Sequence, residues 1–198
     1  MDQVFAPWRI EWVERDAPPG DDGDSDDDGD DGGAENGDDC VFCAFAASED
    51  DRENRVVARG NHGFVLLNNY PYNPGHAMVI PRRHTDEYTA LPEEELLGHA
   101  LLTQRTVAAI ETAFSPDGVN VGYNLGTGAG GSIAHLHGHV VPRWEGDTNF
   151  MAVIGDTQVI VEALEDSYDR LHAAFGAQEG TRVPASNGGG PERAVVVE

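Results

Sequence analysis

The chain has 198 residues, of which 39% are hydrophobic and 8% aromatic, which is enough for one hydrophobic core. Its 36 acidic residues outnumber 12 basic residues, all of them arginine, and give a net charge of -24. A surface this negative disfavours a general nucleic-acid binder, which needs a basic footprint. No apolar run approaches the ~20 residues of a membrane span, and the N-terminus lacks the apolar core of a signal peptide. We therefore expect a cytoplasmic protein with no nucleic-acid and no membrane partner.

Residues 16–39 predict a disordered acidic insert. This segment holds 12 acidic residues, no basic residue and no large apolar side chain, so it cannot bury enough surface to order itself. The rest of the chain still carries a net charge of -12 and no lysine, a pattern that resembles halophilic adaptation to a salt-rich cytoplasm. An acidic arm that recruits a partner is the alternative. We expect residues 1–15 to pack on a domain at 40–176, and residues 177–198 to form a flexible tail, although its final three valines could still dock on the domain.

The domain predicts short strands and two helices. Pro92 followed by glutamates is typical of a helix start, and the apolar residues after it recur at helical spacing. Strands that follow one another through short loops, with one long helix laid across them, indicate an α+β domain with an antiparallel sheet. The predicted elements are strands over 62–68 and 76–81, a helix over 93–114, strands over 118–124 and 135–143, and a helix over 157–175.

Three histidines alternate with non-ionisable residues at His135, His137 and His139. In a strand, a period of two would place all three on one face. A solvated face of an edge strand is one alternative. A metal site built from these three alone is another, although consecutive residues on one strand face fan out and do not converge on an ion.

The sequence HLHGHVVPRW resembles the histidine triad (HIT) motif, and NPGHAMVIP is similar to the strand that precedes it in that superfamily. Together, NNYPYNPGH, NLGTGAGGS and VVPRWEGDTNFM most resemble the branch of dinucleoside polyphosphate phosphorylases, which act on diadenosine tetraphosphate and its relatives. The resemblance covers roughly residues 56–151 and the short N-terminal WRIEWV. It implies a HIT-like fold and a homodimer.

The resemblance also assigns roles to histidines. A neutral imidazole has a free lone pair, and a hydrogen bond at its other nitrogen fixes which atom attacks. By resemblance, His137 is the nucleophile that takes up a nucleoside monophosphate as a phosphoramidate. His139 would stabilise a non-bridging oxygen if it is protonated. His76 would support the site from behind, although alone it reads as an ordinary histidine at a strand end.

Further residues match ligand-binding positions of the family. Asn68 falls where the resemblance places the ribose ligand, although it could equally form a turn. Asn124, Gly131 and Ser132 match the phosphate-binding positions, in a glycine-rich loop whose N–H groups suit phosphate oxygens. Hydrolytic relatives usually carry Gln near Gly131 or Ser132, so its absence favours phosphate over water. Ser132 stands three residues before the first histidine, as in the galactose-1-phosphate uridylyltransferase branch, but that branch has Gln in place of His139.

Cys40 and Cys43 form a CxxC pair, which is half of a zinc site. In many superfamily members a histidine after the second strand and the first triad histidine complete the site, and these map onto His84 and His135. A structural zinc is expected from this resemblance, and a pair of free thiols is the alternative. Zinc would take no part in the chemistry.

The function predicted from the sequence is nucleotidyl transfer that cleaves dinucleoside polyphosphates by phosphorolysis, with inorganic phosphate as second substrate. A hydrolase of the same compounds or of nucleoside phosphoramidates is the first alternative. A nucleotide-binding sensor is an alternative of a different class, which the complete triad argues against.

Overall fold

The computed structural model describes residues 40–131, 133–147, 162–184 and 193–198. The chain divides into two units, Met1–Asp31 and Gly32–Glu198, and every described residue belongs to the second. The expected N-terminal segment and acidic insert therefore lie outside the described residues. The helices and strands are α2 (Val41–Ala47), β1 (Val56–Arg59), β2 (Gly63–Leu67), β3 (Ala77–Pro81), α3 (Glu93–Phe114), β4 (Gly118–Tyr123), β5 (Gly138–Arg143), α5 (Leu164–Gly176), β6 (Thr181–Arg182) and β7 (Val195–Val197), with 3-10 turns η3 (Tyr88–Ala90) and η4 (Thr127–Ala129).

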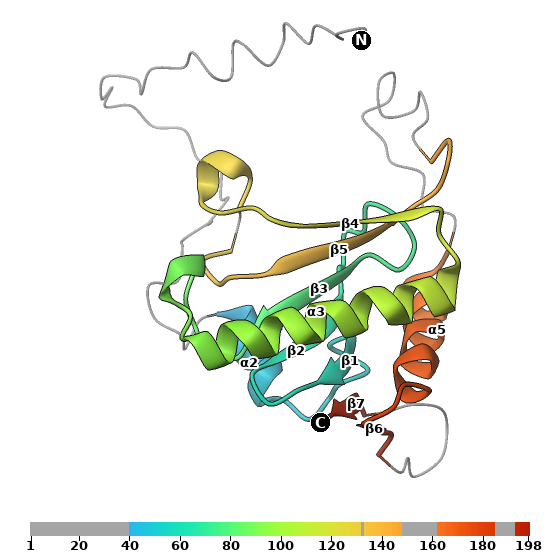
Figure 1. Ribbon diagram of the computed structural model, residues 1–198, viewed down its shortest axis with the longest axis horizontal. Helices are drawn as coiled ribbons and strands as arrows, with labels where there is room; N and C mark the ends of the chain where they lie inside the picture. Colours follow the sequence, from blue (N-terminus) through green and yellow to red (C-terminus); the bar gives the residue numbers. More distant parts are fainter. Residues whose placement is uncertain (1–39, 132, 148–161, 185–192) are drawn as a thin grey trace, which may run out of the picture. The chain divides into compact units, whose positions relative to one another are not determined.

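The strands form one seven-stranded sheet in the order β4-β5-β3-β2-β1-β7-β6, with α3 lying across one face (Figure 1). The α+β architecture, with one long helix and a C-terminal helix, is the predicted one. The prediction of a purely antiparallel sheet is corrected, because β7 pairs parallel to β1, with Val195 opposite Ala58. After α5 the chain returns along β1 in the same direction, and such a crossover produces a parallel pair.

The end of the chain is a strand, where the sequence predicted part of a flexible tail. β7 lies between β1 and β6, and Val195 is fully buried. Three consecutive β-branched residues favour a strand. Burying such a valine side chain contributes about 1.5 to 3 kcal/mol of hydrophobic stabilisation. The sequence prediction also lacked β1, which pairs with β2 through a register shift between Val56 and Ala58.

Successive residues of β2 and β3 face opposite sides of the sheet, and both sides are buried. On one side, Val65 and Val79 pack with residues of α3 and α5 in the larger core cluster. On the other side, Phe64 and Ile80 pack with Phe42 of α2 and with Cys40 in the second cluster. The short helix α2 therefore covers the sheet face opposite to α3. The candidate catalytic side chains lie on this α2 side.

The long helix α3 begins and ends where the sequence predicted. Pro92 precedes its first residue, and three glutamates occupy its first turn, where a negative charge is favoured by the helix dipole. It stops at Ser115, which takes a left-handed φ of 48°. The C-terminal helix α5 begins at Leu164, later than the predicted start, and residues 148–161 lie outside the described residues. No helix in the described part of the chain is long and apolar enough to cross a membrane.

Candidate active site and metal-binding cluster

The strand that carries the histidine motif starts at Gly138, so only His139 lies within it. His135 and His137 precede β5, which corrects the prediction that all three histidines share a strand. Before Gly138 the chain pairs with a loop and not with a strand, because the Leu136 N–H donates to the Thr85 carbonyl at 2.6 Å. The first histidine turns toward the cysteines, and the other two stay together, with ring centroids 5.1 Å apart. The motif therefore serves two sites.

The His137 ring is held with one nitrogen fixed. Its Nδ1–H donates to the His135 carbonyl at 2.7 Å, and its side chain is 8% exposed. Because Nδ1 carries the proton, the lone pair of a neutral ring lies on Nε2. Phe42 packs against the ring at a centroid distance of 5.4 Å and limits its rotation. His137 is thus prepared as a nitrogen nucleophile at Nε2.

A chain of hydrogen bonds fixes the protons of the next two histidines. The Tyr72 N–H donates to His76 Nδ1 at 3.1 Å, so the proton of a neutral His76 is on Nε2. His76 Nε2 lies 3.0 Å from His139 Nδ1 and therefore donates to it. Consequently the proton of His139 is on its own Nε2. That atom is buried and has no hydrogen-bond partner among the described residues. It can donate to an incoming acceptor, such as a phosphoryl oxygen.

Burial keeps these two rings neutral. His76 is fully buried, and this burial lowers its pKa to about 3, with a smaller contribution from neighbouring His139. Burial also lowers the pKa of His139, and nearby His137 adds to the effect. From the sequence, His139 was expected to stabilise a non-bridging oxygen if it is protonated. The hydrogen-bond chain instead supplies an N–H donor from a neutral ring.

Sequence reasoning missed two residues that shape this site. Tyr72 supplies the amide of the chain, and its ring stacks on His76 at a centroid distance of 4.7 Å. Phe42 contacts both His135 and His137 edge-on. In the sequence, only their positions could have indicated them: Tyr72 lies four residues before His76, and Phe42 lies between the two cysteines. Neither position reveals a role without the fold.

The predicted ribose and phosphate ligands have structural partners of their own. Asn68 Oδ1 accepts the Tyr70 N–H at 2.8 Å, which is the turn-forming contact considered as its alternative. The Gly131 N–H donates to the Gly126 carbonyl at 3.1 Å, so this amide is used inside the loop. Asn124 follows β4 at the start of that loop. Ser132 lies outside the described residues.

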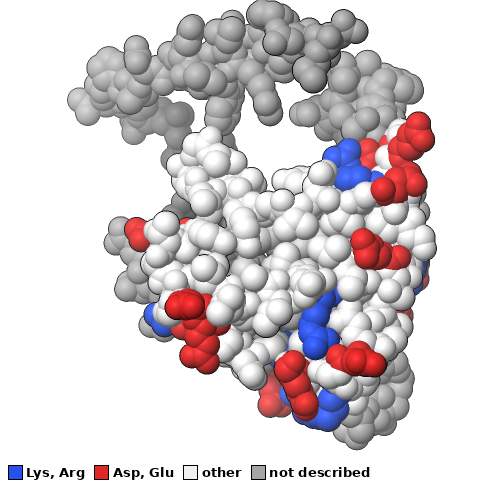
Figure 2. Space-filling view, in the orientation of Figure 1, with Lys and Arg blue, Asp and Glu red and all other residues white. Residues whose placement is uncertain are grey.

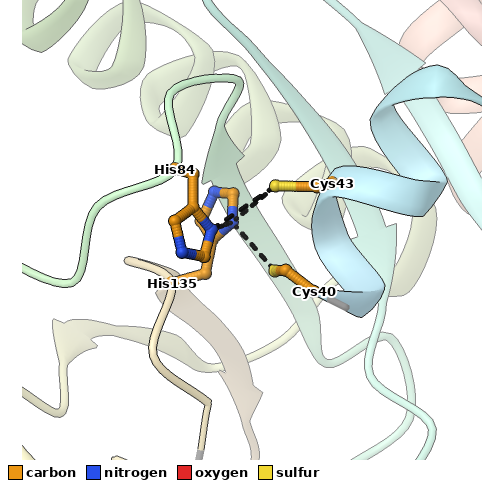
Figure 3. A group of neighbouring side chains, drawn as sticks. All are labelled: Cys40, Cys43, His84 and His135. Atoms are coloured by element: carbon orange, nitrogen blue, oxygen red, sulfur yellow. Dashed lines mark hydrogen bonds between the residues drawn. The ribbon is translucent and has the colours of Figure 1, made fainter. Parts of the chain in front are cut away.

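Cys40, Cys43, His84 and His135 converge beside this site (Figure 3). Their ligand atoms all lie within 4.8 Å of one another. The closest pairs are Cys40 Sγ to His135 Nδ1 at 3.3 Å, Cys43 Sγ to His84 Nδ1 at 3.4 Å, and the two Nδ1 atoms at 3.3 Å. The sequence resemblance had named the same four residues.

This geometry fits a tetrahedral zinc ion. Zn–N bonds near 2.05 Å and Zn–S bonds near 2.3 Å put two nitrogens about 3.3 Å apart, and a nitrogen and a sulfur about 3.5 Å apart, in a tetrahedral site. The observed distances match both values. In addition, His135 Nε2–H donates to the Pro81 carbonyl at 2.9 Å, which leaves the Nδ1 lone pair for a metal. Two thiolates and two imidazoles would fill all four positions of such a site and leave none open for a substrate.

Comparisons with known proteins agree with this arrangement. The HIT domain model matches residues 49–146. The chain is 50% identical over 129 residues to the AP-4-A phosphorylase of Mycobacterium tuberculosis, a match that covers 65% of this chain and 66% of that protein. It therefore spans slightly less than two thirds of this relative. It is also 32% identical to an uncharacterized HIT-like protein of Methanocaldococcus jannaschii, over 54% of this chain and 81% of that one.

A solved structure gives the same result. The Zn-bound histidine triad family protein of Mycobacterium smegmatis superposes with a TM-score of 0.59 at 30% identity, covering 71% of this chain and 96% of that one. The HIT domain model and these relatives thus match the part of the chain that carries the histidine motif. The chain belongs to the HIT family.

Proposed function

We propose that this protein cleaves diadenosine tetraphosphate by phosphorolysis, through a nucleotide bound covalently to His137. The observation that carries the proposal is the pairing of a lone pair on His137 Nε2 with a neighbouring N–H on His139 Nε2. The similarity to the AP-4-A phosphorylase of Mycobacterium tuberculosis supports the choice of substrate.

In the first step, His137 Nε2 attacks the α-phosphorus of one adenosine. An N–P bond forms and the bond from phosphorus to the bridging oxygen breaks, so that ATP leaves with the electron pair of that bond. The ring of the AMP adduct is positively charged, and the His135 carbonyl that accepts its Nδ1–H stabilises this charge. His139 Nε2–H donates to a non-bridging oxygen as negative charge develops there. Losing one donor of this kind typically costs about 10²- to 10³-fold in rate.

In the second step, a phosphate oxygen attacks the same phosphorus. The N–P bond breaks, ADP forms, and the lone pair returns to His137 Nε2. We assign the acceptor phosphate to Asn124, Gly131 and Ser132. The Gly131 N–H already donates within the loop. Among the described residues, this assignment therefore depends on the side-chain amide of Asn124 as the hydrogen-bond donor. Asn68 is proposed to bind the ribose.

We further propose that the cysteine-histidine cluster binds a structural zinc ion. Zinc there would cross-link the start of α2 to His84 and to the chain just before the nucleophile. His135 would then act twice, as a ligand through Nδ1 and as the acceptor for His137 through its carbonyl. The metal would hold the position of His137 without entering the reaction.

A homodimer through α3 and β4 is also proposed. β4 is an edge strand, and the exposed fractions are 57% for Leu97, 61% for Leu101 and 50% for Val121. Figure 2 shows a broad area without charged side chains on this face, with acidic and basic groups at its margins. In a chain with net charge -24, such an area fits a second copy better than solvent. Light scattering should give twice the chain mass, and Leu101→Glu should halve it.

The test of the activity is incubation of the protein with diadenosine tetraphosphate, with and without phosphate, followed by separation of the products. ADP and ATP that form only with phosphate would support phosphorolysis. AMP and ATP formed without it would identify a hydrolase instead. His137→Asn should abolish turnover. His62→Asn, which changes a histidine outside the site, should retain it. Equal turnover in both variants would refute the assignment of the nucleophile.

A further inference from the structure

A hydrogen-bonded hub lies just beyond the end of β5. The Asp147 carboxylate accepts hydrogen bonds from Arg143 Nε at 2.6 Å, from Arg143 Nη2 at 2.7 Å and from the Trp144 N–H at 3.2 Å. A fourth comes from Asn73 Nδ2 at 2.8 Å. Only 10% of the Asp147 side chain is exposed. The hydrogen bond from Arg143 is the main reason that the pKa of Asp147 lies well below its usual range, so the carboxylate stays charged.

Asn73 connects this hub to the loop over residues 69–75. The same Nδ2 also donates to the Pro142 carbonyl at 2.9 Å. The Asn73 carbonyl accepts the His76 N–H at 3.0 Å. Asn73 is thus tied to the end of β5 by its side chain and to His76 by its backbone. The preceding residue, Tyr72, supplies the N–H that fixes the His76 tautomer.

The hub therefore holds the residue directly after the Tyr72 amide. If the loop shifts and this amide no longer meets His76 Nδ1, His76 can hold its proton on Nδ1. His76 Nε2 then becomes an acceptor, and His139 Nδ1 must donate to it. In that arrangement a neutral His139 has no proton on Nε2, so it cannot donate to a phosphoryl oxygen. A contact remote from the reacting atoms would in this way remove the donor.

We propose that Asp147 is a positioning residue for nucleotidyl transfer: through Asn73 and the loop 69–75 it holds the Tyr72 amide on His76 and so keeps the donor proton on His139 Nε2. The expected effect on kcat rests on the proposed function, whereas the expected effect on the tautomers of His76 and His139 does not. Asp147 itself touches none of the reacting groups.

The experiment compares Asp147→Ala, Asn73→Ala and the double variant with Asp117→Ala. Asp117 is a matched control, because its carboxylate accepts the Glu145 N–H at 2.8 Å in the same turn but has no hydrogen bond to the loop 69–75. Two quantities are measured: kcat and KM for diadenosine tetraphosphate with phosphate, and the tautomers of His76 and His139 from ring ¹⁵N chemical shifts. The second measurement needs no turnover.

We expect kcat to fall about 10- to 100-fold in both single variants, with KM changed less than about threefold, because the lost donor acts in the transition state. The double variant should be no slower than the slower single one. His76 should change from one tautomer to a mixture, and Asp117→Ala should behave like the wild type. Asp147→Asn, which retains one acceptor oxygen, replaces Asp147→Ala if the latter does not fold.

Three results would overturn the inference: a single His76 tautomer in the variants, kcat losses that multiply in the double variant, or an equal loss in the Asp117 control. If the wild type does not turn over diadenosine tetraphosphate, the proposed function fails, and the tautomer measurement still decides the role of Asp147.

Discussion

Acidification should destabilise the protein through His99, and the size of the effect follows from its burial. His99 lies on α3 and is fully buried, with Nε2 3.0 Å from the Tyr123 hydroxyl. Burial lowers its pKa from 6.5 to about 4. Between pH 6.5 and pH 4, His99 therefore binds a proton in the unfolded chain but stays neutral in the folded chain. The contribution of neutral His99 to the free energy of unfolding is therefore fully present above pH 6.5, and it is lost as the pH falls toward 4. Between pH 7 and pH 5 this linkage amounts to about 2 kcal/mol.

The assay is denaturant unfolding at pH 7, 6 and 5 in concentrated salt, for the wild type and His99→Leu. The variant should be less stable at pH 7, because the Tyr123 hydroxyl loses its hydrogen bond to His99. However, its loss of stability between pH 7 and pH 5 should be smaller than that of the wild type by about 2 kcal/mol. Protonation of the cysteine-histidine cluster affects both proteins and cancels. Tyr123→Phe removes the hydrogen bond but leaves His99 buried, so it should keep the pH dependence of the wild type. Identical pH dependence in wild type and His99→Leu would refute the reasoning.

Four further outcomes are expected. Gly75→Ala should cost at least about 1 to 3 kcal/mol in unfolding experiments, because φ is +79° and the new Cβ would lie 2.5 Å from the Phe114 ring. Elemental analysis should find one zinc per chain in the wild type and less than one in Cys43→Ala. Val195→Ala should lower the free energy of unfolding by roughly 1 to 3 kcal/mol, since it empties a fully buried position. The melting temperature should rise between 0.1 M and 1 M salt, because the Debye length shortens from ~10 Å to ~3 Å and the ions screen the repulsion between acidic side chains. A melting temperature that does not change with salt would refute this prediction.

Local signals in the sequence were sufficient to predict α3, and the family resemblance was sufficient to name the four side chains that converge in the cysteine-histidine cluster. Pro92, the glutamates after it and a 3.6-residue pattern define a helix without reference to other elements. The CxxC pair and the alternating histidines are rare enough to indicate chemistry, and the four predicted metal ligands do converge.

Features that depend on pairing could not be predicted. The three valines of β7 favour a strand, but their sequence does not reveal that they join β1, because partner choice depends on where α5 returns the chain. Similarly, the period of two in the histidine motif hides the start of β5 at Gly138. The proton arrangement of His76 and His139 depends on the backbone amide of Tyr72, which no side-chain pattern reports. Asp147 acts through Asn73, which is 74 positions away in the sequence.

The position of β7 has a consequence for the order of folding. β1 is synthesised more than 130 residues before its neighbour β7. Closing so long a segment costs entropy before its contacts repay it, which slows folding. The β4-β5-β3-β2 part of the sheet, next to the histidines, consists of shorter-range pairs and can form before β7 has been synthesised. Until β7 is synthesised, one edge of β1 has no partner strand, and a neighbouring nascent chain could pair with it.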